Sequence, residues 1–94
     1  PEPAHREDYA ATQREDGSWL VDGGFSVHET EEILGLAGLA SEDSDYTTVA
    51  GFLLNELRHI PRVGDTLDWK EWRFEVVDMD GTRVDKVLVK RLNK

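Results

Sequence analysis

A hairpin-like pattern near the C-terminus constrains the fold of this chain more than any other feature. Residues 72–79, "WRFEVVDM", alternate apolar with polar side chains, which is the two-residue period of a strand with one buried face. The next two residues, Asp80 and Gly81, are a strong signal for a tight hairpin turn. Residues 83–91 then return as a second strand. We therefore expect an antiparallel sheet whose apolar face must be covered by other elements.

The segments around this hairpin extend the predicted sheet. A short strand is expected over residues 66–69, joined to the next strand by a two-residue connection. In the last strand the apolar phase changes between Val84 and Val87, which predicts a β-bulge near Asp85-Lys86. The last strand is also locally basic. We interpret it as a sheet edge that is available to another chain, because edges present unpaired backbone groups.

Two amphipathic helices are predicted before this sheet, and the first has clear end signals. Ser26 followed by Glu29 has the spacing of a capping box, and Gly35 or Gly38 ends the helix. The expected buried side consists of Val27, Ile33, Leu34 and Leu36.

The second helix carries an apolar stripe at helical spacing. Asp45 or Thr47 is the expected cap, and Pro61 prevents continuation because it lacks an N–H group. We expect Val63 to lie buried beneath a Gly64-Asp65 turn that leads into the next strand. The stripe consists of Val49, Phe52, Leu53, Leu57 and Ile60.

The order of these elements predicts the fold class. A short strand over residues 18–21, closed by Asp22-Gly23-Gly24, precedes the helices. Strand, helix, helix and a three-stranded meander make an α+β fold, with two helices packed on a small, mainly antiparallel sheet. Residues 1–15 are polar and contain two prolines, so we interpret them as a linker or tail and residues 16–94 as the domain. Because the chain begins with Pro1, we interpret it as a piece of a longer protein.

Composition limits the partners and the chemistry. The 94 residues include 20 acidic and 11 basic side chains, with a formal net charge of -9. This sign argues against binding nucleic acid and against docking on an anionic membrane surface. The chain has no cysteine, so disulfides, thiolate catalysis and zinc–thiolate sites are excluded. It has no apolar run long enough to cross a bilayer.

Acidic side chains before each helix are the candidate metal ligands, because calcium and magnesium prefer several oxygen ligands. The candidate set is Asp22, Glu42, Asp43 and Asp45. The spacing is not that of an EF-hand loop, and a solvated acidic loop with helix caps explains the same residues. No catalytic residue is predicted, because no catalytic motif and no glycine-rich phosphate loop occurs. The histidines are scattered at His5, His28 and His59.

Three segments together resemble the CorC/HlyC transporter-associated domain. They are "DGSWLVDGGFSVHETEEILGL", "DYTTVAGFLLNELRHIPRVGDTLDW" and "WRFEVVDMDGTRVDKVLVKRL", which reach from Asp16 to Leu92. In that family the domain follows a pair of CBS domains, and often a membrane domain, in proteins described as hemolysins or as magnesium and cobalt efflux proteins. The resemblance also implies a fold similar to part of the FAD-binding (PCMH-like) superfamily.

The resemblance implies a non-enzymatic accessory domain that modulates ion transport or subunit assembly on the cytoplasmic side of the bacterial inner membrane. Its partners would be the CBS pair and membrane domain of the same parent chain, with a homodimer as a further expectation. Neither nucleic acid nor direct membrane insertion is expected, and no cofactor is required. Two alternatives stay open: a module that binds FAD, by fold analogy, or an adenine nucleotide, and a sensor that binds calcium or magnesium weakly.

Overall fold

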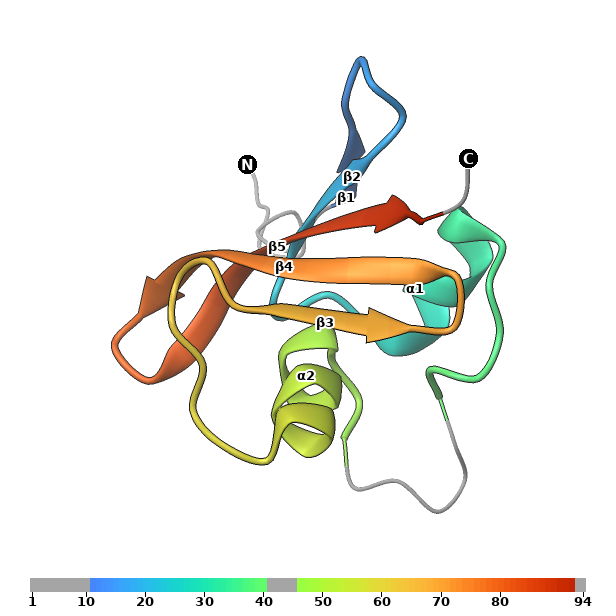
Figure 1. The fold of residues 1–94 in the computed structure, drawn as a ribbon. Helices are drawn as coiled ribbons and strands as arrows, with labels where there is room; N and C mark the ends of the chain where they lie inside the picture. The colour runs from blue at the N-terminus through green and yellow to red at the C-terminus, as the bar shows by residue number, and fades with distance from the viewer. Residues whose placement is uncertain (1–10, 41–45, 93–94) are drawn as a thin grey trace, which may run out of the picture.

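The computed structural model describes residues 11–40 and 46–92, and shows two helices packed on a five-stranded sheet (Figure 1). The strands run in the order β1-β2-β5-β4-β3, and every neighbouring pair is antiparallel. The predicted α+β fold is confirmed. The elements are β1 (Ala11–Gln13), β2 (Trp19–Asp22), α1 (Val27–Leu34), α2 (Val49–Leu57), β3 (Thr66–Trp69), β4 (Trp72–Asp80) and β5 (Arg83–Arg91).

Strand β5 lies in the middle of the sheet, so the prediction that it is an edge is wrong. It pairs with β4 along its whole length and with β2 through residues 86–89. The β2 pairing joins segments separated by both helices, and neither strand carries a local signal for it. The two edges of the described sheet are β1 and β3. The sequence does not predict β1, which pairs with β2 and lies in the segment interpreted as a tail.

The β4–β5 hairpin contains the predicted bulge and a second one. The register passes from Val76–Val87 to Asp78–Lys86 and then to Met79–Val84. One extra residue therefore sits on each strand, at position 77 and at position 85. The second of these explains the change of apolar phase, because it allows both Val84 and Val87 to enter the core, where they are 2% and 0% exposed.

The core lies between the apolar face of the sheet and the helices, with Phe52 of α2 near its centre. The Phe52 ring packs against the rings of Tyr46, Trp69 and Phe74, at centroid distances of 5.7, 5.5 and 5.3 Å. The alternation of β4 buries one face of that strand, as predicted. The aromatic cluster therefore fixes α2 over β3 and β4.

Helix α1 begins and ends where expected, but it buries a different side. Ser26 Oγ accepts hydrogen bonds from the N–H groups of the second and third residues after it, and Gly35 ends the helix with a φ of 73°. The prediction that Ile33 is buried is wrong, since it is 42% exposed. Thr30 takes its place in the core and donates its hydroxyl hydrogen to the Ser26 carbonyl at 2.8 Å. At 3.6 residues per turn, positions 27, 30 and 34 share the buried side.

The N-cap of helix α2 is Thr48, whose Oγ1 accepts a hydrogen bond from the Gly51 N–H at 3.1 Å. The prediction of Thr47 as the cap is therefore wrong, and Asp45 lies outside the described residues. A threonine in either position would fit the sequence pattern, and the choice depends on a backbone bridge between Thr48 and Ser26. Neither described helix is long and apolar enough to span a membrane.

Helix α2 also ends earlier than its apolar stripe predicts. Leu57 is its last residue, and Arg58 adopts a left-handed conformation with a φ of 67°. The chain therefore leaves the helix before Ile60 can continue the stripe. Ile60 and Val63 are 57% and 61% exposed, so the predictions that they are buried are wrong. Pro61, which lies between them, is buried.

Candidate functional site

A groove of about 290 Å³ opens where the turn after β2, the start of α2 and the start of β5 meet. It combines charged side chains with the first turn of a helix, which is why we take it as the candidate site. The lining residues are Asp22, Gly23, Gly24, Thr48, Ala50, Arg83, Val84, Asp85 and Lys86.

Gly23 makes this junction possible. A Cβ atom at position 23 would lie 2.0 Å from the carbonyl oxygen of Val84, so a larger residue would collide with the backbone of β5. The Gly23 N–H donates to the Asp85 carbonyl at 2.8 Å, and its own carbonyl accepts from the Ala50 N–H at 2.9 Å. The predicted glycine turn therefore serves a close approach of three backbone segments.

Lys86 forms two ion pairs with acidic side chains of the groove. Its Nζ lies 3.4 Å from Asp22 Oδ1 and 3.4 Å from Asp85 Oδ2. The negative charge of Asp22, followed by the hydrogen bond to Asp85, raises the pKa of Lys86 above its usual range. The Lys86 ammonium group therefore lies between two carboxylates. Sequence reasoning missed this role of Lys86, because its contact with Asp22 depends on the pairing of β2 with β5.

Asp22 is the one predicted metal ligand that the structure describes. Glu42, Asp43 and Asp45 lie outside the described residues. Within residues 11–40 and 46–92, no group of three or more histidine, aspartate or glutamate side chains is arranged to hold a metal ion. The Asp22 carboxylate has oxygen ligands of the kind that hard cations prefer, but the Lys86 ammonium competes for it.

The N–H groups at the start of α2 are engaged within the protein. The first two donate at 2.9 Å to the carbonyls of Phe25 and Gly23, and the next two bond to the hydroxyl and carbonyl of Thr48. Helix α1 is tied in the same way, since the Val27 N–H donates to the Thr47 carbonyl at 3.0 Å. A phosphate site at a helix N-terminus uses free N–H groups. Here the first N–H groups join the two helices to each other and to the turn after β2 instead.

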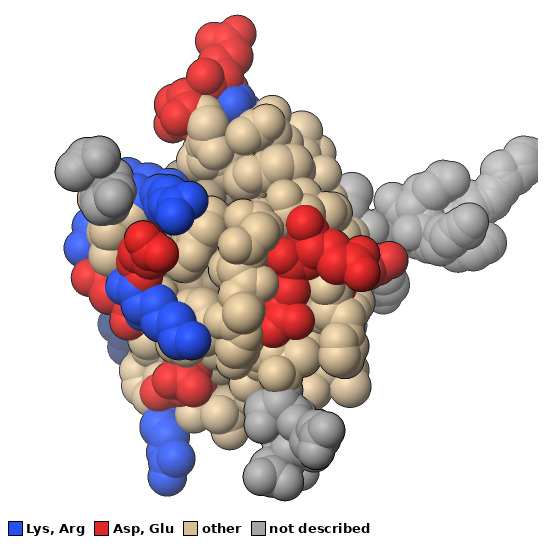
Figure 2. Space-filling model, turned by 90° about the vertical axis from the view of Figure 1, so that its right-hand side faces the viewer, with Lys and Arg blue, Asp and Glu red and all other residues tan. Residues whose placement is uncertain are grey.

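The surface charge is separated into groups. Figure 2 shows acidic side chains on one side of an uncharged band and basic side chains, mixed with further carboxylates, on the other side. One acidic residue of α1 also has a structural role, since Glu31 Oε2 accepts hydrogen bonds from the N–H groups of Gly38 and Ala40, at 3.0 and 2.9 Å. This carboxylate therefore fixes the segment that follows α1.

The model of the CorC_HlyC transporter-associated domain family matches residues 12–93. The chain belongs to this family. It is 47% identical over 81 residues to the UPF0053 protein sll0260 of Synechocystis, and 38% identical over 80 residues to the polyamine export protein of Salmonella typhimurium. Each alignment covers 85% of this chain and 18% of the relative, so the chain spans less than a fifth of the length of these relatives.

Solved structures of transporter-associated domains share the fold. A CorC_HlyC domain of a Xylella fastidiosa hemolysin is 43% identical with a TM-score of 0.76, covering 88% of this chain and 95% of that one. The same domain in complex with Mg++ and Mn++ is 44% identical with a TM-score of 0.76, covering 88% and 98%. A domain from Nitrosomonas europaea is 33% identical with a TM-score of 0.81, covering 87% and 95%. The resemblance seen in the sequence is confirmed.

Proposed function

We propose that this domain is a non-enzymatic regulatory module of a membrane export protein, and that it acts through contacts with the rest of that protein. Its family and its relatives named for polyamine export support this proposal. The observation that carries it is the internal pairing of the groove. The Lys86 ammonium lies between two carboxylates, and the N–H groups at both helix starts bond within the chain. The helix-start N–H groups tie the helices to each other and to the turn after β2, and the Lys86 ion pairs lie within the sheet, between β2 and β5.

The proposed setting follows the family resemblance. The domain would lie on the cytoplasmic side of the inner membrane, with the CBS pair and the membrane domain of the same chain as its partners. Relatives at 38% and 35% identity are named polyamine export proteins, so a polyamine is the first cargo to test, ahead of magnesium or cobalt. Pairing of two copies of the domain would be one form of regulation.

Deletion of the domain from the full-length parent tests this proposal. Cells that carry the intact or the truncated parent would be loaded with labelled putrescine, and export and oligomeric state in detergent would be measured together. We expect the truncated parent to reach the membrane but to show a changed export rate or a changed assembly. Unchanged export with unchanged assembly would reject a regulatory role. Titration of FAD and AMP into the 94-residue chain tests the small-ligand alternative, and we expect no saturable binding.

Divalent-cation binding is a second candidate function. It is supported by the related Xylella fastidiosa domain, 44% identical, whose structure is in complex with Mg++ and Mn++. The proposed ligands in this chain are Asp22, Glu42, Asp43 and Asp45. Calorimetric titration of MgCl2 and MnCl2 should show binding that Asp43→Asn with Asp45→Asn abolishes. Asp68→Asn, on β3, is the matched control, and an unchanged affinity in the double variant would exclude this site.

A further inference from the structure

The loop between α2 and β3 exposes two aliphatic side chains. Ile60 and Val63 are 57% and 61% exposed, more than any other large hydrophobic residue in the described part of the chain. Single exposed aliphatic residues are common on protein surfaces, so exposure alone indicates little. The conformation and charge of residues 58–63, which we call the docking loop, are the reason to treat these two side chains as a candidate contact surface.

A buried proline and several hydrogen bonds hold the backbone of the docking loop in place. Pro61 is buried between the two exposed residues. The Asp65 carboxylate accepts a hydrogen bond from the Arg62 N–H at 2.9 Å, and the Asp65 N–H donates to the Arg62 carbonyl at 3.0 Å. The Gly64 N–H donates to the Val76 carbonyl of β4 at 2.8 Å. A loop that is already ordered loses less conformational entropy when it binds a partner.

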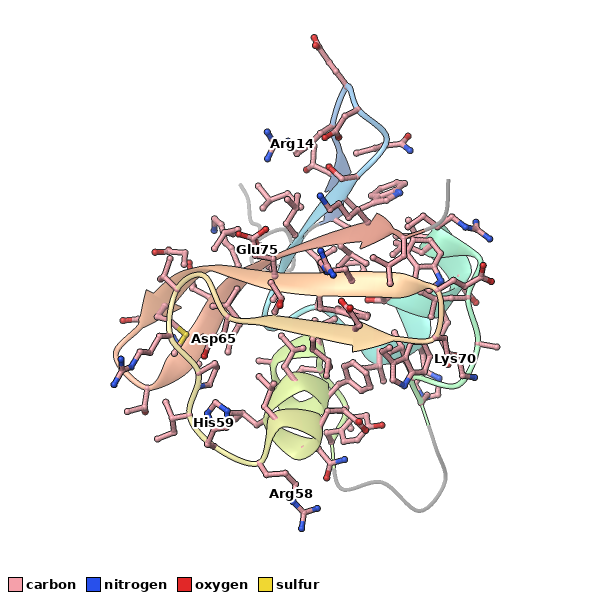
Figure 3. All side chains as sticks on the ribbon, viewed as in Figure 1. Arg14, Arg58, His59, Asp65, Lys70 and Glu75 are labelled. Atoms are coloured by element: carbon pink, nitrogen blue, oxygen red, sulfur yellow. The ribbon has the colours of Figure 1, made fainter. Side chains whose placement is uncertain are left out.

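The docking loop is basic in a strongly acidic chain. Arg58, His59 and Arg62 lie within it and it contains no acidic residue, whereas the whole chain has a net charge of -9. None of the ion pairs within residues 11–40 and 46–92 involves Arg58 or Arg62. Figure 3 shows the Arg58 side chain pointing away from the body of the domain. The loop therefore presents two aliphatic groups beside two guanidinium groups that have no carboxylate partner among the described residues.

We propose that the docking loop binds an acidic, partly apolar surface elsewhere in the same parent protein. This inference rests on the proposed function and names the surface through which the domain would act. Exposed arginines select a surface rich in carboxylates, because a guanidinium group can bind a carboxylate through two hydrogen bonds. The two aliphatic side chains select an apolar patch among those carboxylates.

The size of the loop favours a tethered partner over a free one. A stable complex between separate proteins buries about 800 Å² on each side, and six residues supply only a fraction of that area. A partner in the same chain has an effective concentration that is on the order of millimolar, so a small contact suffices. This chain spans 18% of the length of its relatives, which leaves most of such a parent available as partner.

Site-specific crosslinking in the full-length parent tests the proposal. A photoreactive amino acid, benzoylphenylalanine, would replace Val63, and in a matched control it would replace Ile33, which is also exposed but lies on α1. We expect position 63 to crosslink to a peptide of the same parent, outside this domain and rich in aspartate or glutamate. The same crosslink should be weak or absent from position 33.

Charge variants separate a specific contact from chance proximity. Arg58→Glu with Arg62→Glu should reduce the position 63 crosslink at least fivefold, whereas Arg58→Lys with Arg62→Lys should retain most of it. Crosslinks only to lipid, only to a second copy of this domain, or to nothing would overturn the docking proposal. Export measured in the same membranes distinguishes the docking proposal from the proposed regulatory role. If domain deletion changes export but position 63 crosslinks to nothing in the parent, the docking proposal is wrong and the regulatory role stands.

Discussion

Ser26 and Thr48, the residues that cap the two helices, pair with each other in an isolated antiparallel bridge. The residue after each cap donates its N–H across this bridge, at 3.0 and 2.9 Å. Each cap also accepts hydrogen bonds from the first turn of its own helix. The bridge therefore ties the starts of α1 and α2 together, and a change at either cap should reach both helices.

Thr48→Ala should destabilise the domain through loss of a cap. The threonine hydroxyl accepts the Gly51 N–H at 3.1 Å, and removing such an acceptor costs about 1 kcal/mol of the free energy of unfolding. Urea denaturation followed by circular dichroism measures the change. Thr47→Ala is the matched control, because the described contribution of Thr47 is its backbone carbonyl, and it should change stability by less than about 0.5 kcal/mol. Equal losses in the two variants would contradict the assigned cap.

Gly23→Ala should be poorly tolerated. The added methyl group would lie 2.0 Å from the Val84 carbonyl oxygen, and that oxygen belongs to the central strand β5, which cannot move without breaking its pairs. We expect a loss of about 1–3 kcal/mol, as for other overpacked sites. Gly35→Asn is a suitable comparison, since position 35 has open space and a left-handed backbone that asparagine accepts. A Gly23→Ala domain of wild-type melting temperature would show that the turn after β2 and strand β5 approach less closely than in this structure.

Local patterns in the sequence predict much of this fold. The alternation of β4, the hairpin signalled by Asp80-Gly81 and the Ser26 cap each depend on residues that lie within a few positions of one another, and each is confirmed. The turn itself lies one residue later than the signal, at Gly81-Thr82, because Asp80 still pairs with Arg83. The bulge at position 85 belongs to the same class, because it appears as a change of phase within one strand.

The pairing of strands that lie far apart in the chain could not be predicted from the sequence. Strand β5 has the composition of a protected edge, yet β2 covers that edge across a sequence gap that includes both helices. The contact between Lys86 and Asp22 follows from the same pairing, so the electrostatics of the groove could not be predicted either. Ile60 fits a helical stripe by spacing, but the left-handed turn at Arg58 removes it from the helix. Arginine carries no local signal for that conformation.

A pair of identical substitutions compares Val49, a buried residue of this stripe, with Val63, which is exposed although the sequence predicts it to be buried beneath a turn. Val49 is fully buried, so Val49→Ala should cost about 2 kcal/mol, from two lost methylene equivalents and the cavity that they leave. Val63 is 61% exposed, so Val63→Ala should change the free energy of unfolding by less than about 0.5 kcal/mol. Urea titration of both variants gives the comparison. A large loss for Val63→Ala would mean that this residue packs in solution as its sequence pattern suggests.

The ion pair between Asp68 and Arg73 should make the stability of the domain depend on pH in the acidic range. Arg73 binds the carboxylate through two hydrogen bonds, at 2.6 and 3.0 Å. This hydrogen bonding is the main cause that lowers the pKa of Asp68. A lowered folded-state pKa stabilises the domain above the ordinary carboxyl pKa, and this contribution is lost as the pH falls through the lowered value. The gap in melting temperature between wild type and Asp68→Asn should therefore be present at pH 6 and close toward pH 2.

The Arg73→Gln background supplies the control for that experiment. If the guanidinium group causes the lowered pKa, Asp68→Asn should have little pH-dependent effect once Arg73 has been replaced. The pair is exposed to solvent, so its effect should also weaken in high salt. A gap that persists unchanged at pH 2 would show that Asp68 acts through something other than its charge.

Lys86→Gln should strengthen the binding of divalent cations, if Asp22 is a ligand. The ammonium group lies 3.4 Å from the carboxylates of both Asp22 and Asp85, so it neutralises the groove that a cation would enter. Neutral glutamine removes this competing charge and leaves two carboxylates for a cation to bridge. Calorimetric titration with MnCl2 should show an affinity several-fold higher than that of the wild type. Lys90→Gln, on the same strand and outside the groove, should leave it unchanged. If Lys86→Gln also leaves it unchanged, Asp22 is not a metal ligand and any cation site depends on other residues.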